Sequence, residues 1–201
     1  PRSRGLGDVY KRQVEVSGWG RYPRREAQIH RARFRSDLEH RVREIEPLLA
    51  RGNGRSYGDA CIFHNIVSTL PLDHLLDFDD QSGLLHAVAG VTLEKILQFA
   101  VPRGWFLPVT PGTKFPTLGG CVAADVHGKN HHVEGSIAGF IRELYMVLAD
   151  GRCLRCSSDA YSDLFEATIG GMGLTGLVYA ATLQLRPISS TNIKLQSLKT
   201  S

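Results

Sequence analysis

The sequence predicts an α+β protein. Helix-like and strand-like patterns alternate irregularly along its 201 residues. This length, with 42% hydrophobic residues, is enough for one sizeable core or two small ones. Between these patterns lie three glycine-rich loops, at residues 51–59, 111–120 and 170–176. Long stretches of low helix and strand propensity inside a compact domain usually line a site. We therefore expect a globular domain whose loops carry its function.

Apolar spacing and turn signals predict the regular elements. The spacing from Leu38 to Leu49 predicts a helix with Ser36 as N-cap and Glu39 as its capping-box partner, limited by Pro47. The further elements expected are strands at 75–78 and 84–89, a helix capped by Thr92, a hairpin turning at Asp150-Gly151, a helix at 163–169 and a strand at 177–185.

Charge and cysteine content narrow the classes of function. The formal net charge of +4 is concentrated in residues 1–55, which hold 14 Lys and Arg against 7 Asp and Glu. Without interleaved stacking aromatics, these cations favour a solvated face over a nucleic-acid site, and a lipid-phosphate partner stays open as an alternative. Cys153 and Cys156 form an isolated C-x-x-C pair, which favours a structural strand over a zinc or redox site.

No apolar stretch approaches the roughly 18 to 20 residues that a membrane-spanning helix needs. The start of the chain also lacks an apolar core followed by a small-residue cleavage site. We therefore expect a cytoplasmic protein without a transmembrane segment, with peripheral membrane contact as an option.

The first glycine-rich loop has the composition of an anion-binding loop. Glycines at 52, 54 and 58 let backbone N–H groups approach a phosphate, with Arg51 or Arg55 adding charge and Ser56 a hydroxyl donor. The spacing fits neither the Walker pattern nor the dinucleotide fingerprint, and a single loop of this kind is more often a plain turn. Because three such loops occur in one chain, we favour one long ligand with a pyrophosphate in its middle.

The run Asp-Val-His-Gly-Lys-Asn-His-His at 125–132 contains several metal-ligand types. Gly128 and Lys129 interrupt it, and no carboxylate is placed as in H-E-x-x-H, so we predict no metal site. His127 and Lys129 are instead expected beside an electron-rich ring and its anionic reduced form. For His131 and His132 a polar surface loop is an equal alternative.

These blocks, in this order, resemble the PCMH-type FAD-binding domain of the vanillyl-alcohol oxidase / p-cresol methylhydroxylase superfamily, with the closest likeness to the decaprenylphosphoryl-β-D-ribose 2′-oxidase group. The likeness runs from Val14 to about Pro187, and its most specific part is the string His-Gly-Lys-Asn-His-His. The other resembling blocks are Ser17–Arg21, Gly52–Asp59, Pro111–Thr113, Gly119-Gly120, Ala149–Gly151, Leu164–Thr168 and Gly170–Gly176.

The resemblance implies two α+β subdomains that hold an extended FAD. We expect these subdomains at 14–65 and 66–188, with 1–13 as a non-native or disordered lead and 189–201 as the start of a connection to a C-terminal cap domain. Many superfamily members attach the flavin through a His at the position of Arg55, so here the resemblance implies noncovalent FAD.

The resemblance also implies the site residues. Tyr57, His127 and Lys129 are expected to face the isoalloxazine or the substrate. The residues expected to contact FAD are Gly52, Asn53, Gly54, Arg55, Ser56, Tyr57, Pro111, Gly112, Thr113, Thr117, Gly119, Gly120, Ala123, His127, Gly128, Gly171, Gly176 and Val178.

The reaction implied is oxidation of a secondary alcohol on a sugar or polyprenyl-phosphosugar by hydride transfer to flavin N5. The base would lie in the cap domain, so this chain alone is expected to be inactive, and an NAD-dependent reductase is a candidate partner. Three alternatives stay open: an aldonolactone- or alditol-type FAD oxidase, a noncatalytic flavin- or nucleotide-binding module, and part of an assembly whose basic N-terminal face docks on a membrane or RNA.

Overall fold

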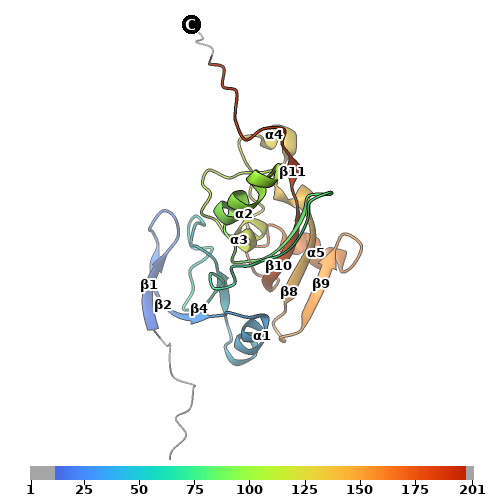
Figure 1. The fold of residues 1–201 in the computed structure, drawn as a ribbon. Helices are drawn as coiled ribbons and strands as arrows, with labels where there is room; N and C mark the ends of the chain where they lie inside the picture. Colours follow the sequence, from blue (N-terminus) through green and yellow to red (C-terminus); the bar gives the residue numbers. More distant parts are fainter. Residues whose placement is uncertain (1–11, 198–201) are drawn as a thin grey trace, which may run out of the picture.

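A computed structural model describes residues 12–197 and contains two main sheets with helices beside them (Figure 1). The four-stranded sheet has the strand order β1-β2-β4-β3, and the five-stranded sheet has the order β5-β6-β10-β8-β9. The predicted α+β class is confirmed. Most of the expected lead at 1–13 lies outside the described residues, but its last two residues begin β1.

The first subdomain is built on the four-stranded sheet. β1 pairs antiparallel with β2, whereas β4 runs parallel to both β2 and β3. A small core of its own includes Val16, Ala27 and Ile66. Because β4 belongs to this sheet, the sheet extends to Ser68, slightly past the boundary expected at residue 65. The elements are β1 (Arg12–Ser17), β2 (Arg24–Arg31), α1 (Arg35–Glu44), β3 (Leu49–Arg51) and β4 (Asn65–Ser68).

Both ends of α1 differ from the prediction. Phe34 rather than Ser36 is the N-cap, and the Asp37 side chain, not that of Glu39, accepts a hydrogen bond from the Phe34 N–H at 3.1 Å. An Asp at this position reaches back to the preceding backbone as a Glu would, so the capping box starts two residues earlier. The helix stops before Pro47, and the apolar residues that follow it enter β3 instead.

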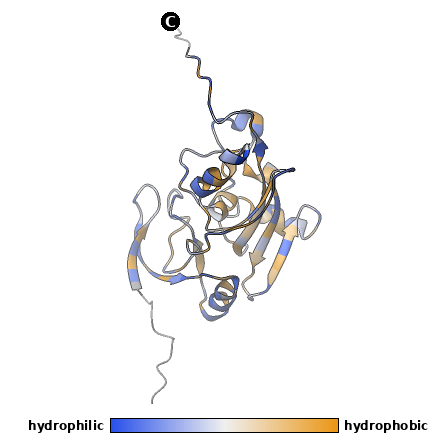
Figure 2. Cartoon of the chain, in the orientation of Figure 1, coloured by the Kyte–Doolittle hydropathy of each residue, from blue (hydrophilic) through white to orange (hydrophobic). Residues whose placement is uncertain are grey.

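The second subdomain is built on the antiparallel five-stranded sheet, which carries the main core. α2 contacts β7 (Trp105–Phe106), and α3 contacts β6 and β10. The predicted cap of α2 is confirmed, since Thr92 Oγ1 accepts from the Lys95 N–H at 3.3 Å. In Figure 2 the strands of this sheet carry hydrophobic residues, whereas α1 is largely hydrophilic. The elements are β5 (Leu75–Asp79), β6 (Leu84–Val88), α2 (Leu93–Ala100), α3 (Leu118–Ala123), β8 (Ile141–Val147), β9 (Cys153–Ser157), α5 (Ser162–Thr168) and β10 (Leu177–Gln184).

Short elements complete the second subdomain. A two-stranded sheet joins β7 to β11, near the end of the described chain. Within residues 12–197, no helix has the length and apolar character that crossing a bilayer requires. The short elements are η1 (Val101–Arg103), β7 (Trp105–Phe106), α4 (His131–Glu134), η2 (Ile137–Phe140) and β11 (Arg186–Pro187), where η denotes a 3-10 turn.

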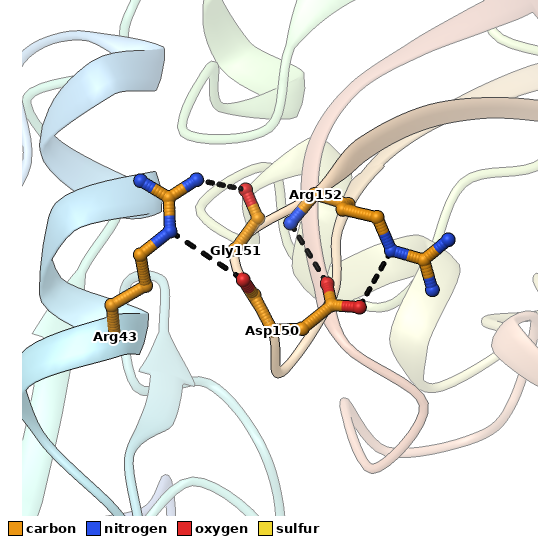
Figure 3. Close-up of polar contacts among 4 residues, drawn as sticks. All are labelled: Arg43, Asp150, Gly151 and Arg152. Atoms are coloured by element: carbon orange, nitrogen blue, oxygen red, sulfur yellow. Dashed lines mark hydrogen bonds and ion pairs between the residues drawn. The ribbon is translucent and has the colours of Figure 1, made fainter.

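The two subdomains are joined where α1 meets the turn of the predicted β8–β9 hairpin (Figure 3). The Arg43 guanidinium donates to the carbonyl oxygens of Asp150 at 3.4 Å and Gly151 at 3.1 Å. Asp150 in turn accepts from the Arg152 N–H at 2.9 Å, and this bond lowers the pKa of the Asp150 carboxyl. Gly151 is buried with φ +78°, and a Cβ there would collide with Arg43. The hairpin turn therefore presents its carbonyl groups to α1.

We expect Arg43→Met to lower the free energy of unfolding by about 1–2 kcal/mol, because two backbone carbonyls lose their charged donor while the apolar stem of the side chain is kept. Arg41→Met is the matched control, since Arg41 makes an exposed ion pair with Glu44 and should change the stability by about 0.5 kcal/mol or less. Urea denaturation of the wild type and both variants measures these changes in the free energy of unfolding. Equal effects would contradict the role given to Arg43.

Candidate functional site

The first glycine-rich loop offers free backbone donors. Among residues 12–197, no protein acceptor pairs with the backbone N–H groups from Gly52 to Gly58. Gly54 and Gly58 have φ values of +63° and +56°, in the left-handed region that favours glycine. Successive N–H groups in a turn with left-handed residues form a concave site for anions. The loop therefore has the backbone that a phosphate group needs.

The two arginines of this loop have different roles. The Arg51 guanidinium donates to the Ser17 carbonyl at 2.7 Å and to the Cys61 carbonyl at 2.7 Å, so it holds the base of the loop. A Cβ on Gly54 would collide with that guanidinium. Arg55 is exposed, which makes it the cation of the loop that a ligand can reach. The sequence alone left these two residues as alternatives.

Arg55 lies between two aromatic rings. Its guanidinium carbon is 5.4 Å from the centroid of Trp19 and 5.5 Å from that of Phe115, within the range of cation–π contacts. Trp19 follows β1 in the first subdomain, whereas Phe115 belongs to the second glycine-rich loop. Sequence reasoning missed both rings as parts of the site, although Trp19 stands in a resembling block and Phe115 inside a predicted loop.

The second glycine-rich loop lies directly against the first. The Asn53 side chain donates to the Phe115 carbonyl at 3.0 Å, and Gly52 allows Thr117 an approach that a Cβ would block. In the described part of the chain, the N–H groups of residues 112–115 have no protein acceptor. Open donors from both subdomains therefore stand side by side, as the predicted long ligand requires.

α3 starts at the end of the second loop and is anchored at its N-terminus. The N–H groups of Leu118 and Gly119 donate to the carbonyls of Val91 at 2.7 Å and Ala89 at 2.8 Å, just beyond the end of β6. A Cβ on Gly119 would lie 2.7 Å from the Cβ of Ala89, so close packing requires this glycine. Thr117 caps the helix by accepting from the Gly120 N–H at 3.3 Å. The first donors of α3 are therefore used within the protein, and Gly120 is its exposed glycine.

The His127-Gly128-Lys129 turn lies against the segment that enters the second loop. Gly128 is buried, and a Cβ there would lie 2.7 Å from the Thr110 carbonyl oxygen. His127 and Lys129 are exposed on either side of it. Tyr57, on the first loop, is 80% exposed and makes no hydrogen bond within the described residues. The structure thus leaves all three predicted flavin- or substrate-facing side chains open to a ligand.

The third glycine-rich segment has a different role from the other two. The Gly170 N–H donates to the Val122 carbonyl at 2.9 Å, and the Met172 N–H donates to the Ala123 carbonyl at 2.8 Å. These bonds satisfy the carbonyls at the C-terminus of α3. Within residues 12–197, the N–H groups of Gly173, Thr175 and Gly176 have no protein acceptor, so this segment offers fewer open donors than the first loop. Contacts of Gly171, Gly176 and Val178 with a cofactor stay predictions.

The histidines of the 125–132 run do not converge on one point. The His127 and His131 rings are 5.5 Å apart and the His131 and His132 rings 5.8 Å apart, both in edge-on arrangements. His131 Nδ1 lies 3.0 Å from the Gly128 carbonyl oxygen, so this ring nitrogen contacts the turn. In the part of the chain that the structure describes, no three His, Cys, Asp or Glu side chains gather as a metal site.

The C-x-x-C pair lies on β9, away from the loops. Cys156 is buried, whereas Cys153 is exposed beside a hollow of about 160 Å³, and its thiol donates to Glu39 at 3.0 Å. Burial raises the pKa of the Cys156 thiol to about 11, and burial together with the Glu39 carboxylate raises the pKa of the Cys153 thiol to about 11. A redox-active pair needs a thiol of lowered pKa. The geometry supports the structural interpretation of this pair.

Comparison with known proteins points to the same ligand as the loops. Residues 34–157 match the model of a family described as an FAD binding domain. The matched range includes the first two glycine-rich loops and the His127-Gly128-Lys129 turn. The FAD-binding domain that the resemblance implied is thereby confirmed.

Curated relatives include several oxidoreductases. The chain is 37% identical over 183 residues to decaprenylphosphoryl-beta-D-ribose oxidase of Mycolicibacterium smegmatis, a match that covers 86% of this chain and 39% of the relative. It is 33% identical over 141 residues to mitochondrial D-2-hydroxyglutarate dehydrogenase of Bos taurus, with 67% and 26% covered. For D-lactate dehydrogenase of Anaerostipes hadrus the identity is 28% over 136 residues, with 65% and 28% covered. The chain thus spans about two fifths or less of these relatives.

The cysteine pair allows a test of its structural role. With a pKa of about 11, on the order of one Cys153 thiol in a thousand is ionised at pH 8, so we expect slow alkylation by iodoacetamide. Glu39→Gln removes a carboxylate that disfavours the thiolate and should speed alkylation several-fold. Glu44→Gln, farther along α1, is the control. Mass spectrometry of the modified peptide measures the rate, and a wild-type rate typical of a solvent-exposed thiol would disprove the structural role.

Proposed function

The chain belongs to the FAD binding domain family, and on that premise we propose that it is the flavin-holding part of an oxidoreductase that oxidises a secondary alcohol of a sugar. The observation that carries this proposal is the run of unpaired N–H groups from Gly52 to Gly58 beside those of residues 112–115. A pyrophosphate needs several donors with no side chain in the way. FAD carries a pyrophosphate in its middle, so the two loops fit its central part.

The first loop supplies both charge and donors to the cofactor. Arg55 provides a cation that two rings hold in place, and Ser56 adds a half-buried hydroxyl group. A guanidinium cannot form the covalent bond to flavin that a His at this position makes in many superfamily members. We therefore propose that FAD is held by noncovalent contacts alone.

The His127-Gly128-Lys129 turn and Tyr57 form the reactive end of the proposed site. When bound, FAD supplies the acceptor of a hydride at N5. Lys129, and His127 when protonated, place positive charge near the ring and stabilise the negative charge that it gains on reduction. Tyr57, exposed on the first loop, is free to donate a hydrogen bond to the ring or to the substrate. None of these residues is assigned as the base that takes the alcohol proton.

The substrate proposal rests on the most similar of the three relatives described above, whose name specifies a decaprenylphosphoryl-ribose. We propose a polyprenyl-phosphosugar as substrate, with oxidation at a ring hydroxyl and an NAD-dependent reductase as the partner that completes an epimerisation. Such a lipid lies in a membrane, so we further propose a cytoplasmic protein with peripheral membrane contact. The relatives that act on 2-hydroxy acids, and the aldonolactone- or alditol-type oxidases, define the competing substrate classes.

We expect the purified chain to be yellow and to release its FAD on acid precipitation. Gly54→Val should weaken FAD binding at least about tenfold, because a β-branched residue disfavours φ +63° and displaces the neighbouring donors. Gly20→Val is the matched control, since a Cβ at Gly20 has no neighbour within 4 Å. The ratio of flavin to protein absorbance after gel filtration measures retention. Equal retention in both variants would remove the first loop from the site.

The substrate class is tested on the full-length protein that contains this chain. Under anaerobic conditions, a polyprenylphosphoryl-ribose should bleach the visible absorbance of the bound flavin, whereas D-2-hydroxyglutarate, an alditol and an aldonolactone should leave it unchanged. Bleaching by one of the other compounds would move the assignment to that class. If FAD binds and none of the four reduces it, the noncatalytic module is the better description.

A further inference from the structure

The His127-Gly128-Lys129 turn is followed by a residue to which the proposed function gives no role. The Asn130 side-chain amide donates to the Pro108 carbonyl at 3.0 Å. The backbone carbonyl of Asn130 accepts from the N–H groups of Val133 and Glu134, both at 3.0 Å, and so starts α4. Asn130 therefore connects three parts of the chain: the turn, the short helix and the segment that leads into the second glycine-rich loop.

Two further contacts restrict this turn. The backbone of Gly128 lies so close to Thr110 that only a glycine fits there. His131 Nδ1 is 3.0 Å from the Gly128 carbonyl oxygen, a hydrogen bond that either the Nδ1–H tautomer or the imidazolium donates. α4 is itself anchored, because Glu134 forms an ion pair with Arg186 of β11 at 2.7 Å, with the Glu134 side chain only 17% exposed. The backbone on both sides of Lys129 is thus fixed by its neighbours.

The Lys129 side chain, unlike the backbone around it, is not held by such contacts within the described residues. It is exposed, and within residues 12–197 no carboxylate forms an ion pair with it. A lysine without a partner keeps its ammonium group in water unless the backbone directs it elsewhere. The position of this charge therefore depends on the geometry of the turn.

We propose that Asn130 is a positioning residue that sets the place of the Lys129 ammonium group relative to the flavin, with His131 as the second support. The inference rests on the proposed function in one respect, namely that Lys129 faces the ring. A cation near the ring stabilises negative charge on it, and this stabilisation falls as the distance grows. If the turn is loosened, any equilibrium that places negative charge on the flavin should therefore shift toward the uncharged ring.

Sulfite is a suitable probe because its sulfur lone pair forms a bond to N5 of oxidised flavin and the electron pair leaves negative charge on the ring. In the FAD-loaded chain, Asn130→Ala should keep the flavin and raise the sulfite dissociation constant about tenfold, the change expected when a unit charge retreats by an ångström or two in a partly buried site. Lys129→Met should raise it at least as much. His132→Ala is the matched control, because His132 is an exposed neighbour without a hydrogen bond among the described residues.

The possible outcomes separate this inference from the proposed function. If Lys129→Met weakens sulfite binding while Asn130→Ala stays within about twofold of the wild type, Asn130 does not position the charge and only this inference is overturned. If Lys129→Met has no effect, Lys129 does not face the ring, and both the inference and that part of the proposed function are wrong. Should Asn130→Ala fail to retain FAD, sulfite binding is measured on His131→Phe, which lacks the second support of the turn. Weaker sulfite binding by this variant supports the inference, and unchanged binding overturns it.

Discussion

The structure depends on keeping backbone donors open while the loops that carry them are held in place. Unpaired N–H groups are costly when buried and harmless when solvated, so such loops must lie at the surface and be fixed from behind. Arg51 does this for the first loop through the Ser17 and Cys61 carbonyls. Asn53 then joins that loop to the second one. The protein thus holds the base of the loops and leaves their outer N–H groups without a protein acceptor among the described residues.

α3 organises the rest of the site, although it has only six residues. Its N-terminus is hydrogen-bonded to the backbone just after the end of β6, and its C-terminus is capped by the third glycine-rich segment. The second loop leads into this helix and the His127-Gly128-Lys129 turn follows it closely. A short, doubly anchored helix therefore sets the distance between the proposed phosphate end and the proposed reactive end of the cofactor.

Features with local causes could be predicted from the sequence, whereas features with distant partners could not. The Thr92 cap, the Asp150-Gly151 hairpin and the strand after the third loop depend on neighbours in sequence, and the structure contains all three. A glycine run has the same composition whether its donors are open or paired. The pairing of the Gly170 and Met172 N–H groups with α3 carbonyls therefore could not be predicted. The separate roles of Arg51 and Arg55, and the contact between Asn130 and Pro108, likewise depend on tertiary neighbours.

Hydrogen exchange of individual backbone amides, compared with and without FAD, tests the central claim most directly. We expect amides 52–58 and 112–115 to exchange rapidly in the FAD-free chain and to become protected when FAD is added, since the free chain offers them no acceptor. The amides of Gly170 and Met172 should be protected in both states, because α3 carbonyls already accept from them. Protection of residues 170–176 alone on FAD addition would show that the first two loops do not hold the cofactor.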